Sequence, residues 1–205
     1  MALVSTFELL VKSQLPSVPA LPPGPLTNLS RVALQGYFLT IANVNFFDVT
    51  LSVVFTIKFP SNPGGPAIRP TSFDEFLSVV DITGTNLLPG QARQAALVPE
   101  VVPRNNKARI TFTIAANETG LLLLEPNILP PSNLLTNPNF EARGYVEIFL
   151  SSLSGSDSAT LLLTPEHRGT FFKNAAGADP DAINLDQIAY ALPISNGGVF
   201  KLSNP

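Results

Sequence analysis

The sequence has no cysteine and no tryptophan, a single histidine, and few charged residues. Without cysteine, disulfide bonds, thiolate nucleophiles and zinc–cysteine sites are excluded. One histidine excludes metal sites that need two histidines from one chain. There is no glycine-rich phosphate or dinucleotide motif, and the nucleophile elbow G-x-S-x-G is missing. These absences predict a protein that is not an enzyme and uses no cofactor.

The chain has unusually few charged residues. Only 13% of the 205 residues are charged, whereas about 25% is usual for soluble domains. The formal net charge is −3 and no run of Lys or Arg occurs, which argues against binding to nucleic acid. No apolar stretch approaches the roughly 18 residues that a membrane span needs. We therefore expect neither nucleic acid nor a membrane span.

Apolar and polar residues alternate along much of the chain. Residues 47–59 give the clearest pattern, with Phe, Val, Leu and Ile on one face and mainly Asp, Ser, Thr and Lys on the other. This pattern predicts a half-buried antiparallel strand. Residues 107–116 alternate in the same way. Further strands are expected at 29–42, 76–82, 119–124, 144–153, 159–164, 169–173, 188–192 and 199–202.

No long helix and no strand–helix alternation is visible, which argues against a parallel α/β fold. The predicted fold class is therefore all-β, an antiparallel two-sheet sandwich of Ig-like or jelly-roll type with long loops rich in Pro and Asn. Four later blocks (ITFTIAA, GYVEIFLSS, LLLTPEHRGTFF, DQIAYALP) follow an order similar to that of the small sandwich proteins that act as soluble transducers of sensory rhodopsin. This resemblance is one of strand order, and it assigns no residue a role.

The N-terminal segment is predicted to differ from the rest. Residues 1–27 are expected to form an arm and a Pro-rich connector, and residues 28–205 the sandwich domain. Residues 3–15 fit a helix with a Ser5–Glu8 capping box, and they also fit a strand, which the rest of the chain favours. PSVPALPPGP should run extended, either as a stiff connector or as a surface crossover. No convincing signal peptide is present, so a cytoplasmic location or one inside an assembled particle is expected.

The single histidine, His167, lies in LLLTPEHRGTFF. Pro165 is expected to end one strand and Gly169 to open the next, so that residues 166–168 cross a turn. His167 is therefore predicted to be a solvated residue at a turn or strand end. Catalysis would need a nucleophile and an acid partner that the sequence does not indicate. A hydrogen-bonded role at an interface is the other alternative.

Acidic residues offer two weaker candidates. Asp179, Asp181 and Asp186 in ADPDAINLDQ could converge on calcium, although the EF-hand spacing is missing and an Asp-Pro-Asp turn is the commoner explanation. Glu147 in GYVEIFL could serve glycoside hydrolysis, but a solvent-facing glutamate on a sheet is expected instead. Sugar binding by stacking on aromatic rings is disfavoured because the chain has three tyrosines and no tryptophan.

Two predicted loops, residues 87–103 and 121–135, are unusually apolar. Exposed apolar patches usually mark an interface, although such loops can also fold back on the sheet ends. Together with the low charge, they favour self-association, with another protein as a second kind of partner. The predicted interface residues are Leu3, Phe7, Leu10, Ile128, Leu129, Leu134 and Leu135.

The function expected from these features is that of a non-enzymatic structural protein. It would be a self-assembling subunit of a homo-oligomer, fibre, shell or larger complex. The alternative is a soluble β-sandwich binding module for carbohydrate or a protein partner, with signalling as one such role.

Overall fold

The computed structural model describes residues 1–13, 31–57, 73–81, 93–94, 98–100, 106–129, 134–135, 138–172 and 186–204. Strands dominate these residues, together with two short 3₁₀ segments, η1 (Phe73–Glu75) and η3 (Ser195–Gly198). The strands are β1 (Ala2–Ser13), β2 (Val32–Asn43), β3 (Val49–Ile57), β4 (Phe76–Asp81), β5 (Arg93–Gln94), β6 (Val98–Glu100), β7 (Lys107–Ile114), β8 (Thr119–Pro126), β9 (Asn139–Leu150), β10 (Ser158–Phe172), β11 (Asp186–Ala191) and β12 (Val199–Ser203).

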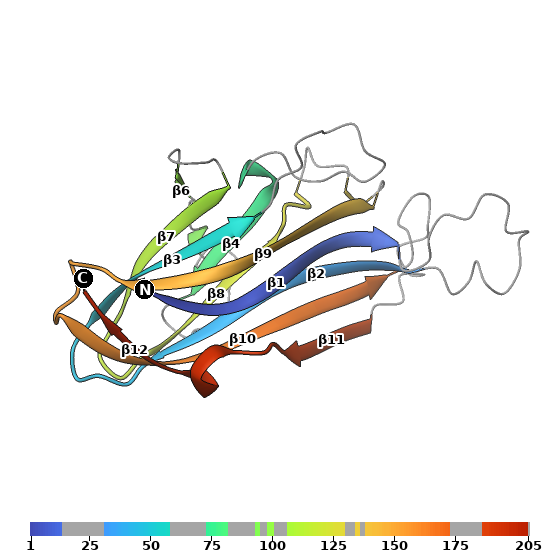
Figure 1. The fold of residues 1–205 in the computed structure, drawn as a ribbon. Coiled ribbons are helices and arrows are strands. Elements are labelled where there is room, and N and C mark those ends of the chain that lie inside the picture. The colour runs from blue at the N-terminus through green and yellow to red at the C-terminus, as the bar shows by residue number, and fades with distance from the viewer. Residues whose placement is uncertain are drawn as a thin grey trace, which may run out of the picture.

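All strands belong to one curled antiparallel sheet, in the order β5-β4-β8-β2-β1-β9-β3-β7-β6 (Figure 1). β10 lies beside β2 and carries β11 and β12 on its far side. The predicted all-β antiparallel class is confirmed. Two separate sheets are not confirmed, because β1 pairs with β2 from Leu10↔Gln35 to Ser13↔Val32 and so joins the strands into one sheet.

The sheet divides along one side of β2. β1 pairs there with residues 32–35 of β2, and β8 pairs with residues 37–42. We call the point between these two pairings the fork. From the fork, β2, β8 and β4 continue one limb of the sheet, while β1, β9, β3 and β7 form the other. The alternating side chains of both limbs meet between them and form the core.

Residues 2–13 are a central strand of the sheet. β1 pairs with β9 from Ala2↔Ile148 to Lys12↔Asn139, which resolves the choice between helix and strand in favour of the strand. At the centre of the core, the rings of Phe7, Tyr37 and Phe55 pack at centroid distances of 5.5, 5.9 and 6.2 Å. The segment predicted as a separate arm thus supplies core side chains of the main sheet.

β3 is buried on both faces, whereas the sequence predicts a half-buried strand. Its outward residues Ser52 and Thr56 are buried along with its inward apolar residues. The neighbouring strands account for this difference. Arg109 on β7 lies over the ring of Phe149 on β9, 5.9 Å from its centroid, and the pair bridges the outer face of β3 between them.

β10 is one continuous strand, which corrects the prediction of two strands with a turn at residues 166–168. It pairs with β2 without interruption from Leu161 to Phe172. Pro165 does not end the strand, because its carbonyl accepts a hydrogen bond from Leu192 N–H (2.9 Å) on the side away from β2. Its missing N–H therefore lies on the same side, in the gap between the residues of β10 that pair with β12 (158–162) and those that pair with β11 (166–171). No hydrogen bond to β2 is lost.

Candidate functional site

His167 lies inside the fork. It is on the inward face of β10, with only 5% of its surface exposed. Its Nε2 accepts a hydrogen bond of 3.1 Å from the backbone N–H of Glu8 on β1. β1 has already left β2 at this residue. The histidine therefore satisfies a backbone donor that has no strand to pair with on that side.

Four residues from four strands complete a closed ring of hydrogen bonds. His167 Nδ1 lies 2.9 Å from Tyr190 Oη, and Tyr190 O–H donates to Gln35 Oε1 at 3.1 Å. Gln35 Nε2 donates to the carbonyl oxygen of Glu8 at 2.9 Å. Glu8 closes the ring through its N–H to His167. Both backbone groups of Glu8 are thus satisfied by side chains across the fork.

The ring fixes the protonation of His167. Because Nε2 accepts a hydrogen bond from a backbone amide, the neutral ring carries its hydrogen on Nδ1, and this N–H donates a hydrogen bond to Tyr190 Oη. Burial lowers the pKa of His167 below its usual value, and the carboxylate of Glu8 opposes this only in part. Burial also raises the pKa of Tyr190. Both groups are therefore neutral near pH 7.

This arrangement links four strands at the fork. Both ring nitrogens of His167 are occupied by partners of the same chain. The buried hydroxyl of Ser5 is bonded to Tyr37 Oη at 2.9 Å. The prediction of a solvated turn histidine is corrected: the residue is buried at mid-strand, because β10 passes through the position where a turn was expected.

β11 forms an exposed edge next to this ring. All of its residues are exposed, and it pairs with β10 only. Leu192 N–H points to β10, and the backbone N–H and C=O groups of successive residues in a strand point to opposite edges. The backbone groups of Gln187, Ala189 and Ala191 therefore point away from β10. No described strand pairs with that side.

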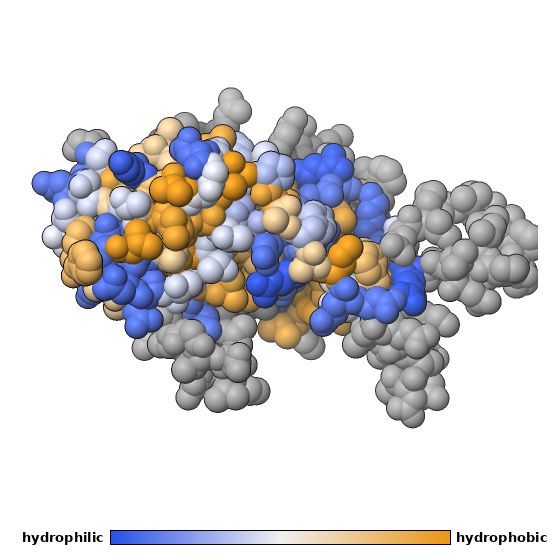
Figure 2. Space-filling model, turned by 90° about the horizontal axis from the view of Figure 1, so that it is seen from below, coloured by the Kyte–Doolittle hydropathy of each residue, from blue (hydrophilic) through white to orange (hydrophobic). Residues whose placement is uncertain are grey.

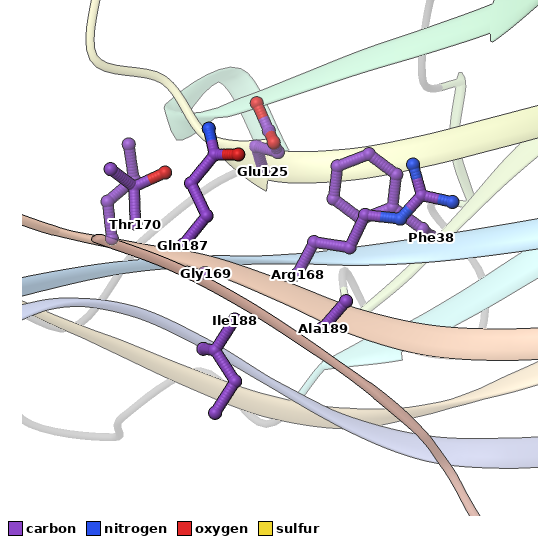
Figure 3. A pocket seen from close by; sticks show the side chains of 9 residues that line it. Phe38, Glu125, Arg168, Gly169, Thr170, Gln187, Ile188 and Ala189 are labelled. Atoms are coloured by element: carbon purple, nitrogen blue, oxygen red, sulfur yellow. The ribbon is translucent and has the colours of Figure 1, made fainter. Parts of the chain in front are cut away.

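A hollow of about 510 Å³ lies on the outer face where β8, β2, β10 and β11 run side by side. Its lining includes Phe38, Glu125, Arg168, Thr170 and Gln187. Figure 3 shows these side chains on one side of the strands, with Ile188 pointing to the opposite side. Burial raises the pKa of Glu125 above its usual range.

No family model, curated protein or solved structure matches the chain. The resemblance of its strand order to the rhodopsin transducers therefore stays a prediction. In the part of the chain that the structure describes, no helix is long and apolar enough to cross a membrane. The same residues contain no group of three or more His, Asp or Glu that could hold a metal ion.

The predicted interface residues fall into two groups. Leu3 and Leu129 are 50% and 53% exposed and remain available to a neighbour. The others are partly or fully covered by the chain itself: Phe7 and Leu134 are buried in the core, Ile128 and Leu135 pack against it, and Leu10 is half-buried. Leu134 thus belongs to the core, so an aspartate at this residue would disrupt folding and would not be a test of an interface.

The acidic candidates are also placed in part. Asp179 and Asp181 lie outside the described residues, and Asp186 forms an ion pair with Arg31. Glu147 is buried, which corrects the prediction that it faces solvent. Lys107 Nζ reaches its Oε2 at 2.9 Å across β3 and covers it. The sequence did not indicate Gln35, Tyr190 or Glu125. Gly36 was the available signal, since a glycine inside an apolar strand marks a close approach.

Proposed function

We propose that this protein is a non-enzymatic structural subunit that assembles with copies of itself, and that the edge of β11 is a contact between them. The observation that carries the proposal is the exposure of every β11 residue, combined with the lack of charge from Gln187 to Ala191. A neutral exposed edge strand is a template for pairing with another strand.

The other edge strands carry the features that block such pairing. β5 and β6 are two and three residues long, and β6 contains Pro99 and Glu100. β12 carries Lys201 at its centre. Short length, proline and lysine are the means by which sheets avoid joining edge to edge. β11 has only Asp186, at its first residue and paired with Arg31.

Antiparallel pairing of two β11 strands is self-complementary. A twofold axis at Ala189 would place the outward-pointing backbone groups of residues 187, 189 and 191 opposite those of the second copy. Ile188 would then lie opposite Tyr190 of the other copy, and Tyr190 opposite its Ile188. Such aromatic–β-branched pairs contribute about 0.2–1 kcal/mol each. These two side chains are 46% and 43% exposed in the single chain.

The surface around the edge supports the same proposal. Leu162 on β10 and Val199 on β12 form an exposed apolar cross-strand pair. Figure 2 views the molecule from the side on which β11 and β12 lie in Figure 1, and apolar side chains are spread over it among polar ones. The scarcity of charged residues removes much of the repulsion that keeps surfaces apart.

We also propose the β-sandwich as the nearest architectural class. The two limbs that leave the fork enclose one core, as the two sheets of a sandwich do. This scaffold is common to assembling subunits and to binding modules. The second candidate function, a soluble binding module, is favoured by the hollow that contains Glu125 and Arg168.

Sedimentation velocity over a range of concentrations tests the assembly. We expect the wild-type chain to form dimers or larger species. Ala189→Pro removes an outward N–H without breaking a bond to β10, so it should give monomers with an unchanged circular dichroism spectrum. Ala189→Ser keeps the N–H and should assemble like the wild type. If the wild type stays monomeric at high micromolar concentration, self-assembly is contradicted. If the proline variant still assembles, self-assembly stands and only the proposed β11 contact is contradicted.

A further inference from the structure

Glu125, Gly36 and Arg168 form a row across three neighbouring strands. Arg168 on β10 pairs with Gly36 on β2. On the other side of β2, Leu124 of β8 pairs with Tyr37, so Glu125 comes next to Gly36. An acid and a base therefore flank a residue that has no side chain, and the hollow lies over this row.

Gly36 gives Glu125 its position. A Cβ atom at Gly36 would stand 2.6 Å from Glu125 Cγ and 3.0 Å from its Oε1. The stem of Glu125 thus lies across β2 toward β10, in space that any other residue would fill. This placement removes the side chain from bulk water without bringing it to Arg168.

The carboxyl group of Glu125 forms no ion pair or hydrogen bond with any residue that the structure describes. A partly buried carboxylate without a partner is unfavourable, which agrees with its raised pKa. Groups of this kind, placed in a hollow, are candidates for ligand binding. A ligand that donates hydrogen bonds and carries positive charge would relieve the unfavourable state.

Arg168 is held at the other side of the hollow. Its guanidinium lies 4.5 Å from the ring centroid of Phe38 and is bonded through Nε and Nη2 to Glu166 Oε2, at 3.0 Å each. These contacts fix the plane of the guanidinium. An arginine has five N–H donors, so some remain for a ligand, and the side chain is 43% exposed.

We propose that this hollow binds a small zwitterion with the charge pattern of an α-amino acid, its ammonium group at Glu125 and its carboxylate at Arg168. A simple anion would meet Glu125, and a simple cation would meet Arg168, so only a molecule with both charges is matched at both ends. β8 and β10 are two strand spacings apart, about 9–10 Å. Both side chains extend from these strands over β2, Glu125 beside Gly36 and Arg168 over Phe38, so a short zwitterion can reach both charged groups.

The remaining lining residues suit such a ligand. Thr170 and Gln187 offer a hydroxyl and an amide to the same hollow, as Figure 3 shows. Gly169 and Ala189 leave room between them, and Leu34 supplies an apolar wall for the side chain of the ligand. A volume of about 510 Å³ lies within the range of small-molecule sites, about 300–1,000 Å³. This inference does not depend on self-assembly.

The test uses the full chain and each of the common amino acids, first by thermal shift and then by calorimetry. We expect at least one of them to bind, and its deaminated and decarboxylated counterparts to bind at least about tenfold more weakly. Glu125→Gln keeps the shape and removes the charge, and Arg168→Gln does the same at the other end. Each should weaken binding at least about tenfold, while Glu118→Gln, on an exposed residue outside the hollow, should leave it unchanged.

Any one of three results would overturn the proposal. The first is that no amino acid binds at concentrations of about 10 mM, which corresponds to very weak affinity. The second is equal binding of the zwitterion and its singly charged counterparts, and the third is equal binding by the wild type and Glu125→Gln. Circular dichroism of each variant establishes that the fold is retained. Binding by a chain that is monomeric in sedimentation would support the zwitterion site and still contradict the assembly.

Discussion

His167 on β10 takes the place of a neighbouring strand for Glu8 on β1. The imidazole Nε2 accepts the Glu8 N–H at 3.1 Å, and Gln35 binds the Glu8 carbonyl at 2.9 Å. A sheet that divides leaves backbone groups without partners along the fork, and buried groups of this kind are unfavourable unless satisfied. The side chains of the ring therefore make it possible for the two limbs to separate here.

The first prediction concerns pH. The pKa of His167 is lowered in the folded protein, while in the unfolded chain it lies near 6.5. As the pH falls through that value, the unfolded state takes up the proton first. The free energy of unfolding should therefore decrease as the pH falls below about 6.5, until the lower pKa of the folded state is passed. Urea denaturation at a series of pH values measures this slope.

Two variants isolate the contribution of His167. Because it is the only histidine, His167→Gln should remove the whole histidine contribution to the slope between pH 7 and pH 5.5. Glu125 acts in the opposite direction, since its raised pKa makes the folded state the better proton acceptor, and Glu125→Gln removes that contribution. An imidazole nitrogen spectrum at pH 7.5 should show the hydrogen on Nδ1. A free energy of unfolding that rises on acidification in the Glu125→Gln background would contradict the ring.

The second prediction concerns a buried pair of hydroxyls. Tyr37 is fully buried, and its Oη lies 2.9 Å from Ser5 Oγ. Tyr37→Phe leaves Ser5 without this partner, and Ser5→Ala does the same to Tyr37, so each should lower the free energy of unfolding by about 1–2 kcal/mol. The double variant should be less destabilised than the sum of the two. Strict additivity in a double-mutant cycle would show that the two hydroxyls do not interact.

Local pattern was sufficient to predict most of the strands but not their pairing. Residues 107–116 alternate, and the structure confirms Ala108, Ile110 and Ile114 as buried, with Arg109 and Thr111 exposed. Alternation reports only which side of a strand is covered. The burial of Ser52 and Glu147 depends on side chains of β7 and β9 that bridge β3. Those contacts arise from long-range pairing, which a single sequence does not reveal.

The ring and the hollow were beyond sequence analysis for a related reason. Pro165 is a valid signal for the end of a strand in isolation, but its position between β12 and β11 makes the missing N–H harmless. The members of the ring come from four strands that are far apart in the chain. Glu125 and Arg168 are brought into one row only by their separate pairings with β2.

The third prediction concerns Asn43, which is 1% exposed at the end of β2. Its Nδ2 lies 2.8 Å from the carbonyl of Phe47, 3.1 Å from that of Ile114 and 2.9 Å from that of Ala115. Asn43→Ala leaves these buried acceptors without the amide and should lower the free energy of unfolding by about 2–3 kcal/mol. Asn43→Asp should be at least as harmful, because a carboxylate would face carbonyl oxygens. Thermal unfolding of both variants distinguishes this from a simple loss of volume.

The last prediction compares two glycines inside strands. A Cβ atom at Gly144 on β9 would lie 2.1 Å from the carbonyl oxygen of Thr56 and 2.7 Å from Cζ of Phe7. Since both are part of the packed core, Gly144→Ala should destabilise the protein by about 3 kcal/mol. At Gly169 on β10 the nearest atom would be 3.4 Å away, which is ordinary contact, so Gly169→Ala should change the free energy of unfolding by less than about 1 kcal/mol. Chemical denaturation of the two variants measures the difference, and equal effects would mean that Phe7 does not pack over Gly144 as described.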